Sequence, residues 1–265
     1  MDRHEAVLRE LNLYPLWVRR EQSVQAMTEP SNPIRPDPVE PHAPLLTLRQ
    51  AQGERTKESI GQAALVSEPA KLQPNDLNWT ELKSTVHSCL ACKLRAGCTQ
   101  TVFGVGDEKA DWLFVGEGPG ADEDAQGEPF VGQAGKLLDN MLMAIKLKRG
   151  KNVYIANVVK CRPPEDESGK QLPPKHDEIA QCLPYLQRQI TLIQPKVIVA
   201  LGKIASNALL GKDATLASLR GAPHDYQGIP LIVTYHPAYL LRSPSEKAKA
   251  WQDLCLAQQT IRASS

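Results

Sequence analysis

The segment VGEGPGADED, residues 115–124, places a carboxylate among glycines, where it can act chemically. Glu117 lies between Gly116 and Gly118, directly after the apolar run WLFVG. Glycines let a substrate approach the backbone closely, and a carboxylate at that point can orient or deprotonate a water molecule. The alternative is an ordinary tight turn whose acidic residues are solvated.

The same glycines superficially fit a dinucleotide-binding loop, but their surroundings argue against one. Such a loop needs a third glycine at a set spacing and a helix that begins at once, with its N-terminus facing phosphate. Here Pro119 interrupts the pattern, and the acidic run 122–124 repels an anion. Phe130 follows in GEPFVG. It is either a core residue or a platform at a pocket mouth, on which a planar ring can stack.

Six cysteines form the second set of residues whose side chains could carry out chemistry or bind a metal. Cys89 and Cys92 make a C-x-x-C pair, whereas Cys161 and Cys182 lie far downstream. Four thiolates suit a zinc ion or an iron–sulfur cluster, and their spacing does not choose between the two. Alternatively, they are small buried apolar residues. Of the remaining two, Cys98 lies near the C-x-x-C pair and is a rival ligand, and Cys255 is expected to be a core residue.

Short apolar runs alternate with helical patterns after residue 75, and these elements must position the polar side chains. The apolar runs are 112–116, 153–159, 197–202 and 230–237, and the helical patterns fall near 133–146, 175–193, 203–210 and 246–262. This alternation predicts a three-layer α/β/α fold with a central, mostly parallel four-stranded sheet. A further helix is predicted in NDLNWTELKSTVHSC, with Asn75 or Asp76 near its cap.

Unusual polar residues lie at or just beyond the end of each of the four predicted strands. They are Glu117, Asn157, Lys203 and His236. In open α/β sheets, ligands bind beyond the carboxyl ends of the strands. The sequence therefore predicts a functional site at this edge of the sheet.

Residues 1–75 differ in composition from the predicted domain, 76–265. Six prolines between residues 30 and 44 predict an extended, flexible linker. The helical segment ahead of them is either a hook for a partner protein or a stub that packs on its own domain. The chain shows no apolar run of about eighteen residues and no signal-peptide core, so we expect a cytoplasmic protein.

Bulk charge limits the kinds of partner. The net charge is +1 over 265 residues, so no global positive field indicates a polyanionic partner. A nucleic-acid surface on this protein must therefore be a local patch or a site that recognises shape.

Three separated stretches together resemble the uracil-DNA glycosylase superfamily, most closely its family-four iron–sulfur branch. They are residues 102–135, ANVVKCRPP and YHPAYLLR, within a resemblance that spans roughly Leu82 to Leu256. The resemblance implies a doubly wound α/β/α sheet. It also implies a [4Fe–4S] cluster with a structural role, held by Cys89, Cys92, Cys161 and Cys182, with Cys98 free.

The resemblance further implies a pocket for a uracil that has left the DNA stack. The loop with Glu117, Gly118 and Glu123 forms its wall, and the flipped base stacks on Phe130. Asn157 offers one donor and one acceptor to uracil O4 and N3–H, a pattern that cytosine reverses.

Two of these residues are implied to act on the glycosidic bond itself. His236 stabilises negative charge on uracil O2 as that bond breaks. Glu117 positions the attacking water and opposes the positive charge on the deoxyribose. A structural histidine near a turn is the alternative for His236.

By the same resemblance, HPAYLLRSPS is a loop that enters the minor groove of DNA. Leu240 or Leu241 fills the space that the base leaves, and Arg242 touches phosphate. The basic run KLKRGK, 146–151, either contacts the DNA backbone or is a solvated helix end.

These residues favour a uracil-DNA glycosylase that starts base-excision repair, and we expect it to be a monomer. One alternative is a weak or inactive relative that binds nucleic acid, or a polymerase through the tail. Another is a zinc-stabilised binding module.

Overall fold

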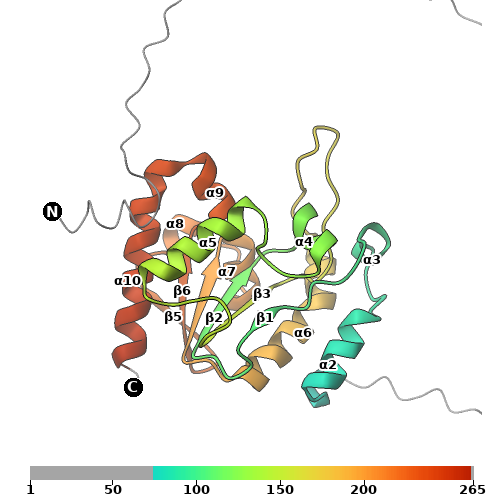
Figure 1. Cartoon of the computed structure of the whole chain (residues 1–265), viewed down its shortest axis with the longest axis horizontal. Coiled ribbons are helices and arrows are strands. Elements are labelled where there is room, and N and C mark those ends of the chain that lie inside the picture. Colours follow the sequence, from blue (N-terminus) through green and yellow to red (C-terminus); the bar gives the residue numbers. More distant parts are fainter. Residues whose placement is uncertain (1–73, 264–265) are drawn as a thin grey trace, which may run out of the picture. The chain divides into compact units, whose positions relative to one another are not determined.

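A six-stranded sheet between two layers of helices forms the fold in the computed structural model, which describes residues 74–263 (Figure 1). The strand order is β1-β3-β2-β4-β6-β5. The strands are β1 Val105–Gly106, β2 Trp112–Gly116, β3 Val153–Asn157, β4 Val197–Leu201, β5 Pro223–Tyr226 and β6 Ile229–Thr234. The predicted α/β/α class is therefore confirmed.

The four central strands are parallel to one another and are the four that the sequence predicts. The two edge strands, β1 and β5, pair antiparallel with their neighbours and escaped prediction. β1 has only two residues, and β5 is mostly solvent-accessible. Neither strand therefore has the continuous apolar run that marks a strand buried on both faces.

The helices include the four that the sequence predicts after residue 130. Those four are α5 Gln133–Ala144, α6 His176–Ile193, α7 Lys203–Leu210 and α10 Lys247–Ala263. The others are α2 Trp79–His87, α3 Leu94–Gly97, α4 Ala121–Gln126, α8 Leu216–Leu219 and α9 Pro237–Arg242, with short 3-10 turns at Pro74–Asp76 and Pro244–Glu246. No helix within residues 74–263 is long and apolar enough to span a bilayer.

Alternation along the strands divides the core between the two faces of the sheet. In β2, Leu113 and Val115 pack with the helices α2, α6 and α7. Trp112 and Phe114 point the other way and pack with α5, α9 and α10. Because successive strand side chains point to opposite faces, one fully buried strand serves both cores.

The start of α2 differs from the prediction of Asn75 or Asp76 as its cap. The cap is Asn78, whose side chain accepts a hydrogen bond from the Glu81 amide at 3.0 Å, while the Glu81 carboxylate accepts one from the Asn78 amide at 2.9 Å. This reciprocal capping box fixes the helix start. The predictions for the tail concern residues outside the described part of the chain, apart from its last two positions.

The chain crosses the sheet in a way that leaves a crevice at one edge. From β2 it runs through α5 to β3 on one side, and α6 then carries it back to β4 on the other side of β2. Ligands of doubly wound sheets bind at such a switch point, beyond the carboxyl ends of the strands.

Candidate active site

A cavity of about 480 Å³ lies beyond the carboxyl ends of β2, β3 and β6. It brings together residues that are up to 125 positions apart in the sequence, since Glu117 and Arg242 both line it. Its other lining residues are Gly118, Gly120, Glu123, Phe130, Ala134, Asn157, Lys170, Gln171, His236, Ala238 and Tyr239. Lys203 is not among them; its ammonium pairs with Asp213 at 3.1 Å.

Glu117 directly follows β2 and lies in the wall of the cavity. Burial raises the pKa of its carboxyl group above the usual value. The backbone carbonyl of Glu117 accepts a hydrogen bond from the Val159 amide at 3.1 Å, which fixes the loop beside the end of β3. The carboxylate is thus a base held in a poorly solvated place.

Asn157 is the last residue of β3, and it is buried. Its Oδ1 atom has no hydrogen-bond partner within the described residues. A buried acceptor without a partner is costly unless a ligand supplies the donor. The close approach of this amide depends on Gly116, where a Cβ atom would lie 2.4 Å from Asn157 Oδ1.

His236 caps the N-terminus of α9, and this contact defines its tautomer. Its Nδ1 atom accepts a hydrogen bond from the Ala238 amide at 3.2 Å. In the neutral ring the proton is therefore on Nε2, the other ring nitrogen. Burial, with a smaller contribution from the charge of Arg242, lowers the pKa of His236 to about 4, and Glu123 opposes the shift. The ring is thus a neutral donor at physiological pH.

The Phe130 ring lies against His236 in the same cavity. The two ring centroids are 5.5 Å apart, with a tilt of 32° between the planes. Phe130 has a positive φ of 57°, which is rare for a residue with a side chain. The ring is largely buried, with 6% exposure, so it is a rigid wall of the cavity.

Two of the three carboxylates in the acidic run after the glycines bind backbone amides, whereas Asp122 is exposed. Glu123 accepts hydrogen bonds from the amides of Gly120, Val131 and Gly132 at 2.9 to 3.1 Å. Asp124 is buried and accepts from the Thr99 and Gln100 amides. These carboxylates therefore fold the loop around the cavity, because ionised acceptors make strong bonds to amides.

The segment predicted as a DNA-binding loop is instead the helix α9. Pro237 at its first turn and His236 at its cap favour a helix start, a signal that sequence reasoning missed. The structure separates the two candidate leucines. Leu240 is 1% exposed and packs in the core, whereas Leu241 is 43% exposed. Arg242 is exposed at the rim of the cavity.

The basic run 146–151 does not present all its charges to solvent. The Arg149 guanidinium bonds to the carbonyls of Pro129 and Phe130 and to the Asp139 carboxylate. Arg149 therefore matches neither prediction for this run, since it is neither a free DNA contact nor part of a solvated helix end. The sequence analysis also did not single out Lys170, Gln171 and Tyr239 as cavity residues. Lys170 and Gln171 follow no strand and belong to no motif, and Tyr239 carries no signal of its own within YHPAYLLR.

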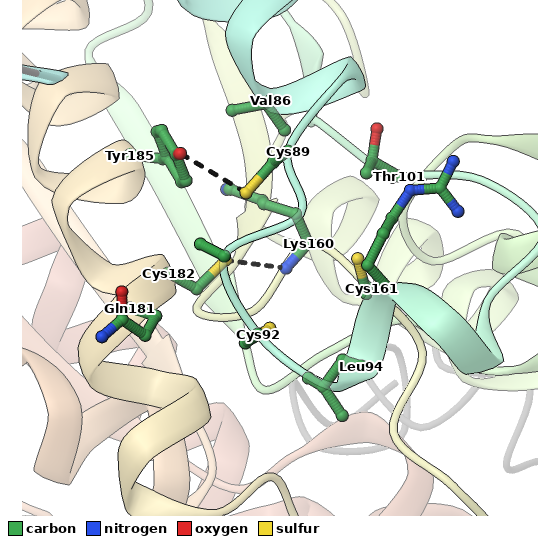
Figure 2. Close-up of a pocket in the computed structure, with 12 residues that line it drawn as sticks. Val86, Cys89, Cys92, Leu94, Thr101, Lys160, Cys161, Gln181, Cys182 and Tyr185 are labelled. Carbon is green, nitrogen blue, oxygen red and sulfur yellow. Dashed lines mark hydrogen bonds between the residues drawn. The ribbon is translucent and has the colours of Figure 1, made fainter. Parts of the chain in front are cut away.

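A second pocket is lined by four thiols from three separate segments (Figure 2). Cys89 and Cys92 lie in the turn between α2 and α3, Cys161 follows β3, and Cys182 is on α6. Cys89 accepts a hydrogen bond from the Tyr185 hydroxyl at 3.4 Å. Cys182 accepts one from the Lys160 amide at 3.3 Å. Donors to sulfur are typical partners of thiolate ligands.

Two of the four thiols, Cys161 and Cys182, are buried, and Cys89 and Cys92 are partly buried. Burial raises the pKa of Cys161 and Cys92, and it raises that of Cys182 to about 11. Cys98 contacts Cys161 at the margin of the pocket, and the Arg95 guanidinium donates to its carbonyl oxygen at 3.2 Å. Within residues 74–263, no three His, Cys, Asp or Glu side chains lie as they would around a single metal ion.

Comparison with known proteins assigns the family. The family model of the uracil DNA glycosylase superfamily matches residues 103–255, which contain the whole sheet. The chain therefore belongs to the uracil DNA glycosylase superfamily.

Several individual relatives of the chain are type-4 uracil-DNA glycosylases. The chain is 42% identical to the type-4 uracil-DNA glycosylase of Archaeoglobus fulgidus over 167 residues, 60% of this chain and 81% of the relative. It is 43% identical to that of Thermotoga maritima over 166 residues, 62% and 83% of the two chains. For the Pyrobaculum aerophilum enzyme the identity is 39% over 186 residues, 66% and 91%.

Proposed function

We propose that this protein is a uracil-DNA glycosylase of the type-4 class, which hydrolyses the N-glycosidic bond of uracil in DNA and so starts base-excision repair. The observation that carries the proposal is the cavity itself. It combines a neutral histidine of defined tautomer, an unpartnered amide oxygen and a carboxylate, namely His236, Asn157 and Glu117.

Substrate binding begins with the extrusion of the nucleotide from the stack, since the glycosidic bond is inaccessible inside a duplex. The flipped ring stacks on Phe130, and the backbone at Gly118 lies close to it. A Cβ atom at Gly118 would lie 2.7 Å from the Val159 side chain, so this part of the wall requires a glycine. Glu123 acts indirectly by holding the loop through three amides.

Asn157 provides the choice of base. Its buried Oδ1 lacks a donor, and uracil N3–H supplies one. The amide nitrogen then donates to uracil O4. Cytosine presents an acceptor at N3 and a donor at N4, so both contacts would fail and leave buried groups unpaired.

Departure of the base places negative charge on uracil, and His236 stabilises it. The Ala238 amide holds the ring with the proton on Nε2, the atom that is free to donate to O2. Because the imidazole is neutral, it donates without requiring proton uptake. The lowered pKa maintains that state across the physiological range.

Glu117 acts on the sugar side of the bond. The deoxyribose acquires oxocarbenium character as the bond breaks, and an adjacent carboxylate opposes that positive charge. The same carboxylate orients the water and accepts its proton as the C1′–O bond forms. Its position in a poorly solvated wall strengthens both effects.

DNA contact falls to the exposed residues of α9. Leu241 is exposed next to the cavity rim and takes the space that the base leaves, while Leu240 stays in the core. Arg242 contacts phosphate. Backbone contacts of this kind position the duplex without reading its sequence.

We propose that the four thiols of the second pocket hold a [4Fe–4S] cluster, as the resemblance to the family-four enzymes implies. Around one zinc ion every thiolate lies about 2.3 Å from the metal, which gathers the sulfurs tightly. In a cluster each thiolate binds a different iron, so the sulfurs lie further apart than around one zinc ion. Cys89, Cys92, Cys161 and Cys182 would hold it, and its contribution is to tie three segments together.

The rest of the proposal concerns the setting of the enzyme. We infer a cytoplasmic monomer that acts on uracil-containing DNA through the domain 76–265. The tail 1–75 serves as a tether, with a short segment that engages a partner protein. An inactive DNA-binding or polymerase-associated relative is the second candidate, but the intact set of Glu117, Asn157 and His236 favours the enzyme.

The test is excision of uracil from a 5′-labelled oligonucleotide, followed by alkaline cleavage of the abasic site. A matched oligonucleotide with thymine at the same position is the control. We expect a product from the uracil strand alone. A protein that binds both strands, carries its iron and yields no product would establish the inactive relative instead.

A further inference from the structure

Phe130 has a backbone conformation that its neighbours must enforce. Its φ of 57° lies in the left-handed region, where a Cβ atom is unfavourable. Such residues persist only when the surrounding structure determines them, and they concentrate at functional sites. The position of the ring in the cavity therefore depends on whatever holds its backbone.

Arg149 holds that backbone with three hydrogen bonds. One terminal nitrogen donates to the Pro129 carbonyl at 2.8 Å, and the other donates to the Phe130 carbonyl at 2.7 Å. The Nε atom donates to Asp139 on α5 at 2.9 Å. The planar guanidinium thus connects two successive carbonyls to a helix, an arrangement that a lysine cannot reproduce.

The helix approaches the same carbonyl from the other side. At Gly135 on α5, a Cβ atom would lie 1.8 Å from the Phe130 carbonyl oxygen. The carbonyl is therefore enclosed between α5 and the Arg149 fork. This enclosure fixes the peptide that follows the strained residue, and with it the direction of the ring.

We propose that Arg149 is a positioning residue for the base, because it locks Phe130 in the strained conformation that presents its ring to a flipped uracil. The inference rests on the proposed function. Arg149 does not line the cavity, and its side chain is 22% exposed. It acts only through Phe130, and Asp139 in turn orients Arg149.

The test is a double-mutant cycle of Arg149→Met and Phe130→Ala in the full chain. The readouts are single-turnover excision of uracil and the inhibition constant of free uracil. From the strength of base–aromatic stacking, we expect each single variant to lower the excision rate and to raise the inhibition constant of uracil by about ten- to a hundredfold. Because Arg149 acts through the ring, the double variant should resemble Phe130→Ala, which shows non-additivity.

Controls separate positioning from general destabilisation. Arg149→Lys should recover only part of the loss, and Asp139→Asn should show a smaller loss of the same kind. Arg188→Met removes another arginine that bonds to a backbone carbonyl, that of Leu77 at 2.6 Å, and should leave uracil inhibition unchanged. Binding to uracil-free DNA should be the same for every variant.

Additive losses in the cycle would overturn the proposal, as would an Arg149→Met variant that excises uracil and is inhibited by it like the parent. Thermal unfolding of each variant identifies a loss of fold, in which case Arg149→Lys and Asp139→Asn carry the cycle with Phe130→Ala. A parent protein that never excises uracil would refute the proposed function instead.

Discussion

The candidate active-site cavity and the thiol pocket lie only four residues apart along the chain, at Asn157 and Cys161, yet they are built in different ways. In the cavity, the protein itself holds the polar groups: Ala238 orients His236, and three amides orient Glu123. In the thiol pocket, three distant segments meet, and their sulfurs have a few weak donors.

The two sites differ in what holds their side chains in position. The cavity is assembled at strand ends of a sheet that is buried on both faces, so the fold itself positions its residues. The turn with Cys89 and Cys92 belongs to no strand and connects α2 to the short helix α3. We therefore expect a bound cluster to order the thiol pocket, whereas the cavity needs no cofactor to form.

Removal of one ligand of the cluster should have the largest effect. Cys161→Ala or Cys182→Ala should abolish the brown colour and most of the soluble protein, because the cluster links distant segments. Cys98→Ala and Cys255→Ala are the matched controls and should keep about four iron atoms per chain. Iron analysis and the visible spectrum report the result, and stoichiometric zinc in anaerobic preparations would contradict the cluster.

Removal of the His236 side chain should slow cleavage of the glycosidic bond and leave the thiol pocket intact. His236→Ala removes a donor to developing charge, so we expect a loss of about a hundred- to a thousandfold in single-turnover excision. The colour and the binding of uracil-free duplex should match the parent. A loss of iron in this variant would show that the two sites depend on each other.

The pH dependence should separate Glu117 from His236. Burial raises the pKa of Glu117, so its active carboxylate is lost as the pH falls through that raised value. His236, with a pKa of about 4, stays neutral through most of that range. Glu117→Gln should lower excision by about a hundredfold at neutral pH and remove this acidic decline. An unchanged pH–rate profile would exclude Glu117 as the titrating group.

Asn157→Asp should have a smaller effect that concerns the choice of base. A carboxylate cannot donate to uracil O4, so we expect excision of uracil to fall by about ten- to a hundredfold. Acceptance of cytosine should rise relative to uracil, because the new acceptor suits the cytosine amino group. Competition between uracil and cytosine oligonucleotides measures the ratio, and an unchanged ratio would place base recognition elsewhere.

Deletion of residues 1–75 should have the smallest effect on both sites. The linker has too little apolar content to form part of a core. Excision rate and iron content of the truncated protein should match those of the full chain. Loss of either would show that the tail packs on the domain.

Much of the fold could be predicted from the sequence because its signals are local. The four central strands are continuous apolar runs, and the long helices have a clear amphipathic pattern. Edge strands and the short helices α4 and α9 lack such runs. The cap of α2 was misplaced by a few residues, since several polar residues near the start can serve as caps.

The sequence by itself determined the four central strands, three of the four polar residues at their carboxyl ends and the set of cysteines, since each follows from types and spacing along the chain. Only the tertiary structure decided between Leu240 and Leu241, fixed the tautomer of His236 and assigned Arg149 to the backbone of Phe130. The physical reason is that burial and hydrogen-bond partners depend on contacts between distant segments, which one-dimensional periodicity does not encode.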